Sequence, residues 1–398
     1  TSRAFSAATS ADCWKPRGPD ASLMQGKAAG MSSSWFQRYL LPGFAFKAFV
    51  IGGGYATGRE LAEFFLPAGP RGGLLGMALA AAIWSVVCIA TFTFARATRS
   101  PDYQTFFRNL LGPGWVAFEV VYLLLLVLVL AVFGAAAGAI GAALFGWPSL
   151  VGTLCLGAGI AAVVTFGNTS VERVFKWVTI FLYVVYVLFV LLALAKFGDP
   201  IVANLALDVP TTGWMAAGVT YASYNVVAAV VILPVLRHLH SQKDAIIAGA
   251  LCGPLAMIPA VLFFICMIAY YPQVGQEPLP SEYLLQRLDA PVFHVTFQLM
   301  IFAALLESGC GGVHAVNERL AHAWQLRTGK VYSSRARLAF AAALLVVAML
   351  LADRFGLVTL IARGYRLLAY ALIAVYVVPL LTFGLWQLRR GALAAPSS

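Results

Sequence analysis

The stretch "IGGGYATGRELAEFF", Ile51 to Phe65, places three consecutive glycines, then an arginine and two glutamates, inside the first apolar segment of the chain. Each glycine weakens a helix by roughly 1 kcal/mol relative to alanine, and lipid offers no water to unpaired backbone groups. Close packing of small residues would explain a glycine pair, but it does not require Thr57, Arg59 and Glu60. The stretch therefore predicts a discontinuous membrane helix whose unwound backbone lines a cavity.

The composition is that of a polytopic membrane protein. The 398 residues are 61% hydrophobic and 11% charged, with a mean hydropathy of +0.85 and a net charge of +11. The basic residues lie in short runs between apolar segments, which is typical of membrane loops and not of a nucleic-acid-binding surface. Membrane helices need ~20 residues each. We expect an all-α fold of ten transmembrane helices, over about residues 36–65, 73–97, 113–145, 148–167, 172–197, 211–236, 244–271, 291–316, 336–352 and 366–388.

The domain organisation follows from the same pattern. Residues 1–33 are polar and rich in small residues, so we expect a disordered N-terminal extension, in which Met31 is a candidate for the native start. After it we expect a single transporter-sized transmembrane domain over residues 34–390. A cytoplasmic tail over residues 391–398 ends the chain. Lysine and arginine favour one set of loops by roughly two to one, which predicts a plasma-membrane protein with both termini cytoplasmic. The cysteines form no CxxC pair and read as packing residues.

A discontinuous first span predicts an interrupted partner, because transporters built from inverted repeats break the corresponding helix of the second half. With five spans in a repeat, the partner is the sixth, "MAAGVTYASYNVVAAVVILPVL", Met215 to Leu236. It combines Gly218 and Pro234 with a polar and aromatic cluster that ends at Asn225. An asparagine is costly against lipid, so we expect Asn225 to face the interior of the bundle.

Charged residues in the first and eighth spans are candidates for function. Glu307 lies deep in an apolar run, where a carboxylate must form an ion pair, bind a cation or take up a proton. A purely structural partner for it would be Arg59, Lys47 or Arg363. Arg59 and Glu63 are four residues apart and are expected to pair. That pairing leaves Glu60 facing inward, toward a substrate amine or toward an arginine of another span.

These three motifs, "GGGYATGRELAEFF", "YASYN" and "LESGCGGVHAVNERL", resemble the YkvI-type amino acid permease family. The family belongs to the amino acid–polyamine–organocation superfamily, and the resemblance covers about residues 35–388. It implies a LeuT-like fold, a 5+5 inverted repeat with broken helices 1 and 6. The chain has "GGGYATG" where a form closer to "GAGFATG" is expected, which keeps the pattern of small, aromatic and small residues.

The resemblance also implies residue roles. The substrate would lie between the broken helices, with its carboxylate against the backbone N–H groups of Gly53, Gly54, Tyr55 and Ala56. The opposite wall would come from Tyr221, Tyr224 and Asn225, and the tyrosine rings also suit a cationic amine. A coupling ion, Na⁺ or H⁺, would be held by Thr57, Glu307 and Ser308. Gating would fall to Arg59, Glu60 and Glu63.

The expected function is therefore secondary active transport of an amino acid or related small amine, coupled to Na⁺ or H⁺, with the lipid bilayer and the small-molecule substrate as partners. A channel or a membrane sensor on the same fold is the alternative. An enzyme is not expected, because the chain has no GxSxG, HExxH or Walker motif. We likewise expect no cofactor, no nucleic acid and no bound metal other than Na⁺.

Overall fold

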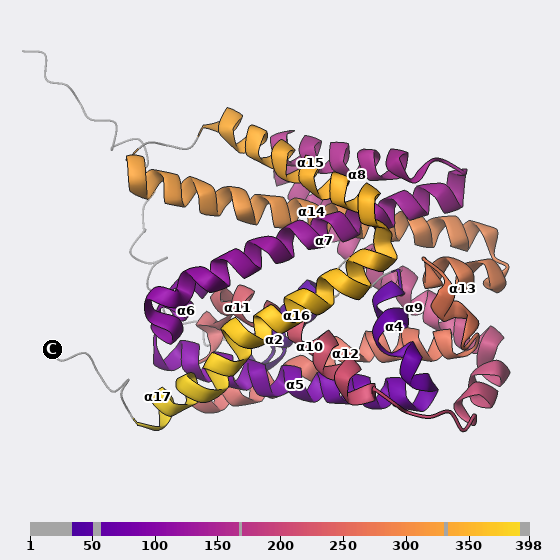
Figure 1. The fold of residues 1–398 in the computed structure, drawn as a ribbon, viewed down its shortest axis with the longest axis horizontal. Coiled ribbons are helices and arrows are strands. Elements are labelled where there is room, and N and C mark those ends of the chain that lie inside the picture. The colour runs from indigo at the N-terminus through magenta and orange to yellow at the C-terminus, as the bar shows by residue number, and fades with distance from the viewer. Residues whose placement is uncertain (1–33, 51–56, 167–168, 330–332, 391–398) are drawn as a thin grey trace, which may run out of the picture.

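The computed structural model describes residues 34–50, 57–166, 169–329 and 333–390, and every element in these ranges is helical. The α-helices of the bundle lie side by side (Figure 1). They are α2 (Leu41–Val50), α4 (Arg59–Phe64), α5 (Gly69–Ala97), α7 (Trp115–Phe145), α8 (Ser149–Phe166), α9 (Thr169–Leu205), α10 (Trp214–Asn225), α11 (Ala228–Val231), α12 (Gln242–Ile268), α14 (Pro291–Thr328), α15 (Ser334–Thr359), α16 (Arg366–Leu372) and α17 (Leu385–Arg389). Helices α6 (Tyr103–Leu111) and α13 (Pro280–Leu288) mark opposite ends of the bundle (Figure 1).

Shorter 3₁₀ and π-helical elements complete the described chain. The 3₁₀ elements are η2 (Leu66–Ala68), η3 (Gly112–Gly114), η4 (Leu233–His238) and η5 (Gln273–Gln276). The π-helical ones are η1 (Phe36–Leu40), η6 (Leu360–Tyr365), η7 (Ile373–Val377) and η8 (Leu380–Gly384). The last three interrupt the C-terminal run of helix, and π-helical turns are frequent at functional sites.

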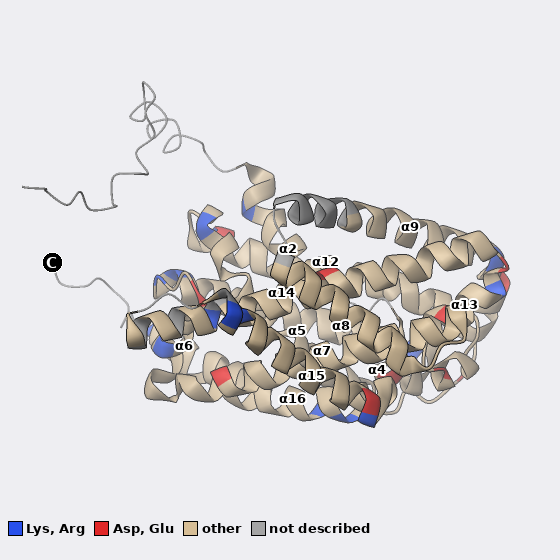
Figure 2. Cartoon of the chain, turned by 90° about the horizontal axis from the view of Figure 1, so that it is seen from above, with Lys and Arg blue, Asp and Glu red and all other residues tan. Residues whose placement is uncertain are grey.

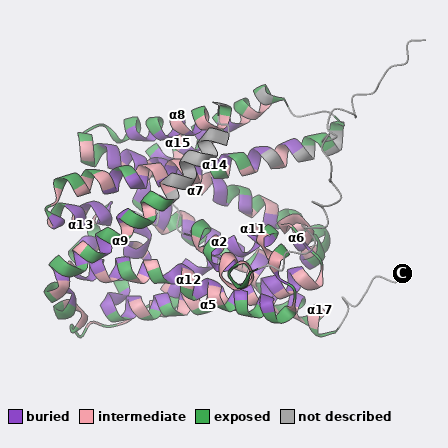
Figure 3. Cartoon of the chain, turned by 180° about the vertical axis from the view of Figure 1, so that it is seen from behind, coloured by how far each residue is buried: buried purple, intermediate pink, exposed green. Residues whose placement is uncertain are grey.

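The bundle has the surface of a protein that spans a membrane several times. Leu191, Val184 and Leu350 are 59%, 61% and 64% exposed on its sides. Exposed residues face outward along the helices and buried ones face the interior (Figure 3). Charged residues gather mainly at the two ends (Figure 2). An apolar flank between charged ends matches a bilayer between two aqueous phases, so the chain is a multi-pass membrane protein.

Among the described residues, seven helical stretches are long and apolar enough to cross a membrane. They are Arg59–Ala97, Tyr103–Phe145, Ile180–Leu205, Trp214–Val231, Gln242–Ile268, Pro291–Ala321 and Arg335–Arg389. The last has 55 residues, kinks at Gly356 with φ 68°, and runs through the ninth and tenth expected spans. Shorter helices occupy the first and fourth expected spans. The all-helical class is confirmed, while the number of ten membrane crossings stays a prediction.

The first expected span is divided between two helices. Helix α2 is described as far as Val50, residues 51–56 lie outside the described chain, and α4 begins at Arg59 after a turn at Thr57 and Gly58. Gly58 has φ 76°, in the left-handed region, and a Cβ there would lie 2.5 Å from Phe263. Both observations require glycine, because side chains rarely adopt this conformation and the site has no room for one. The turn allows α4 to start in a new direction.

The sixth expected span is also interrupted. Helix α10 ends at Asn225, a two-residue turn follows, and α11 resumes for four residues before the 3₁₀ element η4. Within the turn, the N–H of Ala229 donates to the carbonyl of Val226, three residues back, at 2.9 Å. Pro234 lies in the first turn of η4, where it lacks the N–H group that a continuing α-helix would use. Asn225 therefore lies at the end of a half-helix.

Glycines allow α10 and α12 to pack closely against α5. A Cβ on Gly218 would lie 2.6 Å from the carbonyl oxygen of Gly76, and one on Gly253 would lie 2.0 Å from that of Ala81. The indole N–H of Trp84 donates to the Ala222 carbonyl at 3.1 Å. These contacts fix the half-helix that carries Asn225 against the body of the bundle.

Candidate functional site

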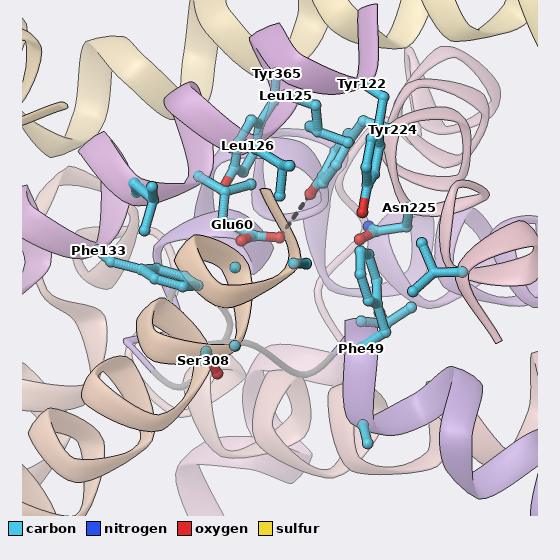
Figure 4. A pocket seen from close by; sticks show the side chains of 18 residues that line it. Phe49, Glu60, Tyr122, Leu125, Leu126, Phe133, Tyr224, Asn225, Ser308 and Tyr365 are labelled. Atoms are coloured by element: carbon cyan, nitrogen blue, oxygen red, sulfur yellow. Dashed lines mark hydrogen bonds between the residues drawn. The ribbon is translucent and has the colours of Figure 1, made fainter. Parts of the chain in front are cut away.

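A cavity of about 290 Å³ lies where the two interrupted spans meet. This volume is at the small end of the range for small-molecule sites. It lies among α2, α4, α7, α10, α11, α14 and η6 (Figure 4). Its lining residues are Ala48, Phe49, Val50, Glu60, Tyr122, Leu125, Leu126, Val129, Leu130, Phe133, Tyr224, Asn225, Val231, Ser308, Gly311, Gly312, Ala315 and Tyr365.

Glu60 provides the acidic group of the cavity. It lies in the first turn of α4, where a carboxylate is favoured by the helix dipole, and it is 6% exposed. Its Oε2 accepts a hydrogen bond from the Tyr224 hydroxyl at 2.6 Å. The neighbouring Arg59 points elsewhere, because adjacent positions on a helix diverge by about 100°. Glu60 is therefore a buried carboxylate that faces the cavity.

An aromatic wall stands beside this carboxylate. The ring of Tyr224 stacks on that of Tyr365 with centroids 4.5 Å apart and planes at 28°, and Phe64 contacts it from α4 at 5.7 Å. Figure 4 shows Tyr365 and Tyr224 on the same side of the cavity as Glu60. The sequence interpretation did not include Tyr365. Its only signal is a tyrosine within an apolar segment, between Arg363 and Arg366.

Of three further predicted site residues, Asn225 and Ser308 line the cavity and Tyr221 does not. Asn225 is 8% exposed, and its Nδ2 donates to the Tyr221 carbonyl at 3.0 Å, so part of its hydrogen-bonding capacity remains for a ligand. Ser308 reaches the cavity from α14. Tyr221 lies behind the wall, with its ring 4.8 Å from Phe65 and 5.6 Å from Trp84. Its fully buried hydroxyl has no partner within the described part of the chain.

The α13 end of α4 is tied to the segment that follows α12. Arg59 pairs with Glu63 at 2.6 Å, which is the pair that their spacing predicts. The same guanidinium donates to the carbonyls of Gly275 at 2.8 Å and Glu277 at 3.0 Å. The N–H of Ser281 donates to the Thr57 carbonyl at 3.0 Å. These contacts close α4 against η5 and α13.

The predicted coupling residues lie in different environments. Thr57 is fully buried, and its hydroxyl oxygen accepts the Arg59 N–H at 3.3 Å. Ser308 lines the cavity, whereas Glu307 is half-buried and interacts electrostatically with Tyr183 of α9. Their role in holding an ion stays a prediction. The predicted backbone site at Gly53, Gly54, Tyr55 and Ala56 lies outside the described residues.

The arrangement of helices is that of a class of membrane proteins with known structures, the transporters with the LeuT fold. A Na⁺-coupled sialic acid symporter aligns over 89% of this chain and 82% of its own, with a TM-score of 0.59 at 13% identity. MhsT in complex with L-phenylalanine aligns over 91% and 99%, with a TM-score of 0.54 at 14% identity. A manganese transporter of Eremococcus coleocola aligns over 87% and 78%, with a TM-score of 0.56 at 13% identity. At these identities the likeness establishes the fold.

At the level of sequence, the chain is a distant homologue of the uncharacterized membrane protein YkvI of Bacillus subtilis (strain 168). The two are 23% identical over 338 residues, which cover 83% of this chain and 92% of the relative. No family model matches the chain. The relative supports the assignment to multi-pass membrane proteins.

Proposed function

We propose that the protein is a secondary active transporter that carries an amino acid or a related small amine by alternating access. The observation that carries this proposal is the cavity at the meeting point of the two interrupted spans, with the buried carboxylate of Glu60 held by Tyr224. In transporters with broken helices, the substrate site lies at such a point. The structurally similar proteins include a Na⁺-coupled symporter and one in complex with L-phenylalanine.

The roles of individual residues form part of the proposal. Tyr224 and Asn225 contact the substrate, and Tyr221 supports Tyr224 from behind. The N–H groups of Gly53, Gly54, Tyr55 and Ala56 are proposed as a further side of the site. The coupling ion is Na⁺ or H⁺, with Thr57, Glu307 and Ser308 as its ligands or carriers. Arg59, Glu60 and Glu63 form the gate at the α13 end. The setting is the plasma membrane, with both termini in the cytoplasm.

The test is uptake into proteoliposomes that contain the purified chain, with labelled amino acids and amines. A transporter predicts saturable accumulation driven by an imposed Na⁺ or pH gradient, and faster entry of label when unlabelled substrate is loaded inside. A channel would give flux without this exchange. Uptake that neither gradient drives would overturn the proposed coupling. Glu307→Gln should abolish the dependence on the gradient, and unchanged coupling in that variant would remove Glu307 from the mechanism.

A further inference from the structure

The charge inside the cavity has one sign. Among the described lining residues, Glu60 is the only charged side chain, and none is a lysine, arginine or histidine. Arg59 is turned toward Glu63, and Lys47 lies 4.5 Å from the ring of Tyr183, on α9. Arg319 is not a lining residue, and its guanidinium lies 4.1 Å from the ring of Tyr122, which does line the cavity. No basic group of the described lining balances the carboxylate.

The Glu60 carboxylate is only partly satisfied within the described residues. Oε2 accepts the Tyr224 hydroxyl, and no donor to Oε1 is seen in the described ranges. A carboxylate removed from water is costly unless it is paired and hydrogen-bonded. The remaining oxygen faces the cavity together with the rings of Tyr224 and Tyr365 (Figure 4). An ammonium group there would supply the missing charge and the missing donors.

The rest of the cavity suits an apolar body attached to that ammonium group. Phe49 of α2 and Phe133 of α7 add further aromatic rings to the lining. Between Tyr122 and Phe133, α7 contributes only the aliphatic side chains of Leu125, Leu126, Val129 and Leu130. Ring faces attract cations and also pack against hydrocarbon. The limited volume of about 290 Å³ excludes large solutes.

A carboxylate on the ligand finds less support in the same lining. Apart from the tyrosine hydroxyls, the neutral polar side chains of the lining are those of Asn225 and Ser308. The carboxylate of Glu60 occupies the first turn of α4, so an anion near that turn would be repelled by it. The described lining thus favours a cation over a zwitterion, and a zwitterion over an anion.

We propose that this cavity takes a small organic ammonium ion with an apolar body and no carboxylate, its ammonium at Glu60 Oε1 and against the rings of Tyr224 and Tyr365. The proposal rests on the transporter function proposed above and narrows its substrate class to amines.

The test compares three probes that share one phenyl ring and differ in charge. They are 2-phenylethylamine, L-phenylalanine and 3-phenylpropionate, each titrated calorimetrically into the purified full-length chain in detergent. The expected order is the amine at least tenfold tighter than the amino acid, and no measurable binding of the carboxylate. L-Phenylalanine that binds as tightly as the amine, or an amine that does not bind, overturns the proposal. This comparison needs no variant.

Variants identify the residue responsible. Glu60→Gln should weaken binding of the amine at least tenfold and reduce the preference over L-phenylalanine. Glu119→Gln is the matched control, because Glu119 is also an acid, half-buried on an apolar helix, but does not itself line the cavity. This substitution should change the affinity for the amine less than threefold. Equal losses in the two variants would assign the preference to overall charge and overturn the role of Glu60.

Failure of this inference is distinct from failure of the proposed function. Amine binding without uptake into proteoliposomes would refute transport and leave the ligand class intact. Driven uptake of amino acids but not of amines would support transport and refute the ligand class.

Discussion

The hydroxyl of Tyr224 donates to Oε2 of Glu60 at 2.6 Å and so connects the two half-helices α10 and α4 inside the bundle. Both side chains are almost completely buried, at 4% and 6% exposure. The alternating access proposed for this protein requires the broken helices to move against other parts of the bundle. A relative movement of α4 and α10 would break this bond, so we expect ligand binding and helix movement to be coupled at Glu60.

Tyr224→Phe should lower the stability of the unliganded protein. A hydrogen bond to a charged group contributes about 1.5–3 kcal/mol, and the buried carboxylate would keep no donor among the described residues. The ring and its stacking on Tyr365 would remain. The measurement is the midpoint of thermal unfolding in detergent. Unfolding is monitored by the reaction of the buried Cys88 thiol with a labelling reagent.

Tyr365→Phe is the matched control, because it also removes one hydroxyl from the stacked pair. No hydrogen bond from the Tyr365 hydroxyl is seen in the described ranges, so its loss should shift the midpoint less than that of Tyr224. Tyr365→Ala should lower it further, since the stacked ring disappears. Equal shifts for the two phenylalanine variants would contradict the importance of the Glu60 bond.

Arg59→Gln should loosen the closure at the α13 end. The substitution removes the ion pair with Glu63 and the bonds to two carbonyls of the neighbouring segment. Contacts of about 1.5–3 kcal/mol correspond to roughly a 10- to 100-fold change in the open population. The readout is a cysteine at Ser281, which is fully buried and whose hydroxyl has no partner in the described structure. With the native cysteines replaced, its maleimide labelling should accelerate at least tenfold.

Arg71→Gln is the control for this experiment. Arg71 lies near the same end, and its Nε donates to the Leu205 carbonyl at 3.0 Å, away from η5 and α13. Labelling at Ser281 should therefore stay within about twofold of the parent. If both arginine variants accelerate labelling to the same extent, the effect comes from lost surface charge and not from the closure.

Much of this architecture is readable from the sequence because its signals are local. Glycine destabilises a helix wherever it stands, so the glycines of the first span predicted an interruption; Gly52, Gly53 and Gly54 lie outside the described residues, and the described Gly58 has φ 76° in a turn just before α4 begins at Arg59. Helical spacing predicted the pair of Arg59 with Glu63. In the same way, the cost of a lipid-facing asparagine predicted that Asn225 is buried.

The rest of the site depends on distances between helices, which no local pattern encodes. Tyr365, in η6, is far from Tyr224 in sequence, and the two rings meet only through the packing of the folded helices. Ser308 and Glu307 are neighbours, yet only Ser308 lines the cavity, because the rotation of α14 decides which side chain faces inward. The small residues of the lining, Gly311, Gly312 and Ala315 of α14 and Ala48 of α2, likewise come together only in the folded bundle.

Gly311→Val should fold normally and reduce the size of the ligand that the protein accepts. A Cβ on Gly311 would meet no heavy atom of the described structure within 4 Å beyond its own turn of helix, and the residue lines the cavity. Added bulk in an occupied site typically costs about 1–3 kcal/mol, roughly 5- to 150-fold in affinity. Ligands with large apolar groups should lose affinity, while those with a methyl group should change little.

Gly198→Val on α9 serves as the matched control, because a Cβ there also meets nothing within 4 Å and the residue is not part of the cavity lining. It should leave ligand selectivity unchanged. Selectivity that moves equally in both variants, or a Gly311→Val protein that binds large ligands as before, would show that ligands do not occupy the cavity beside Gly311.

Glu282→Gln should release α13 from α14. Oε2 of Glu282 lies 2.7 Å from Nε2 of His294 and accepts a hydrogen bond from Gln298, while Oε1 accepts one from Gln286 at 2.9 Å. An amide has one oxygen where the carboxylate has two, so at least one of these donors would lose its acceptor. Because Gln298 is fully buried, that loss should cost about 1–3 kcal/mol. Amide hydrogen exchange over Pro280–Leu288 should then accelerate about tenfold or more.

Asp289→Asn is the control for this experiment. It neutralises an exposed acid next to α13, and Asp289 has φ 56°, a conformation that asparagine tolerates. Unchanged protection of α13 in Glu282→Gln, or equal losses in the two variants, would show that this cluster does not hold the helix in place.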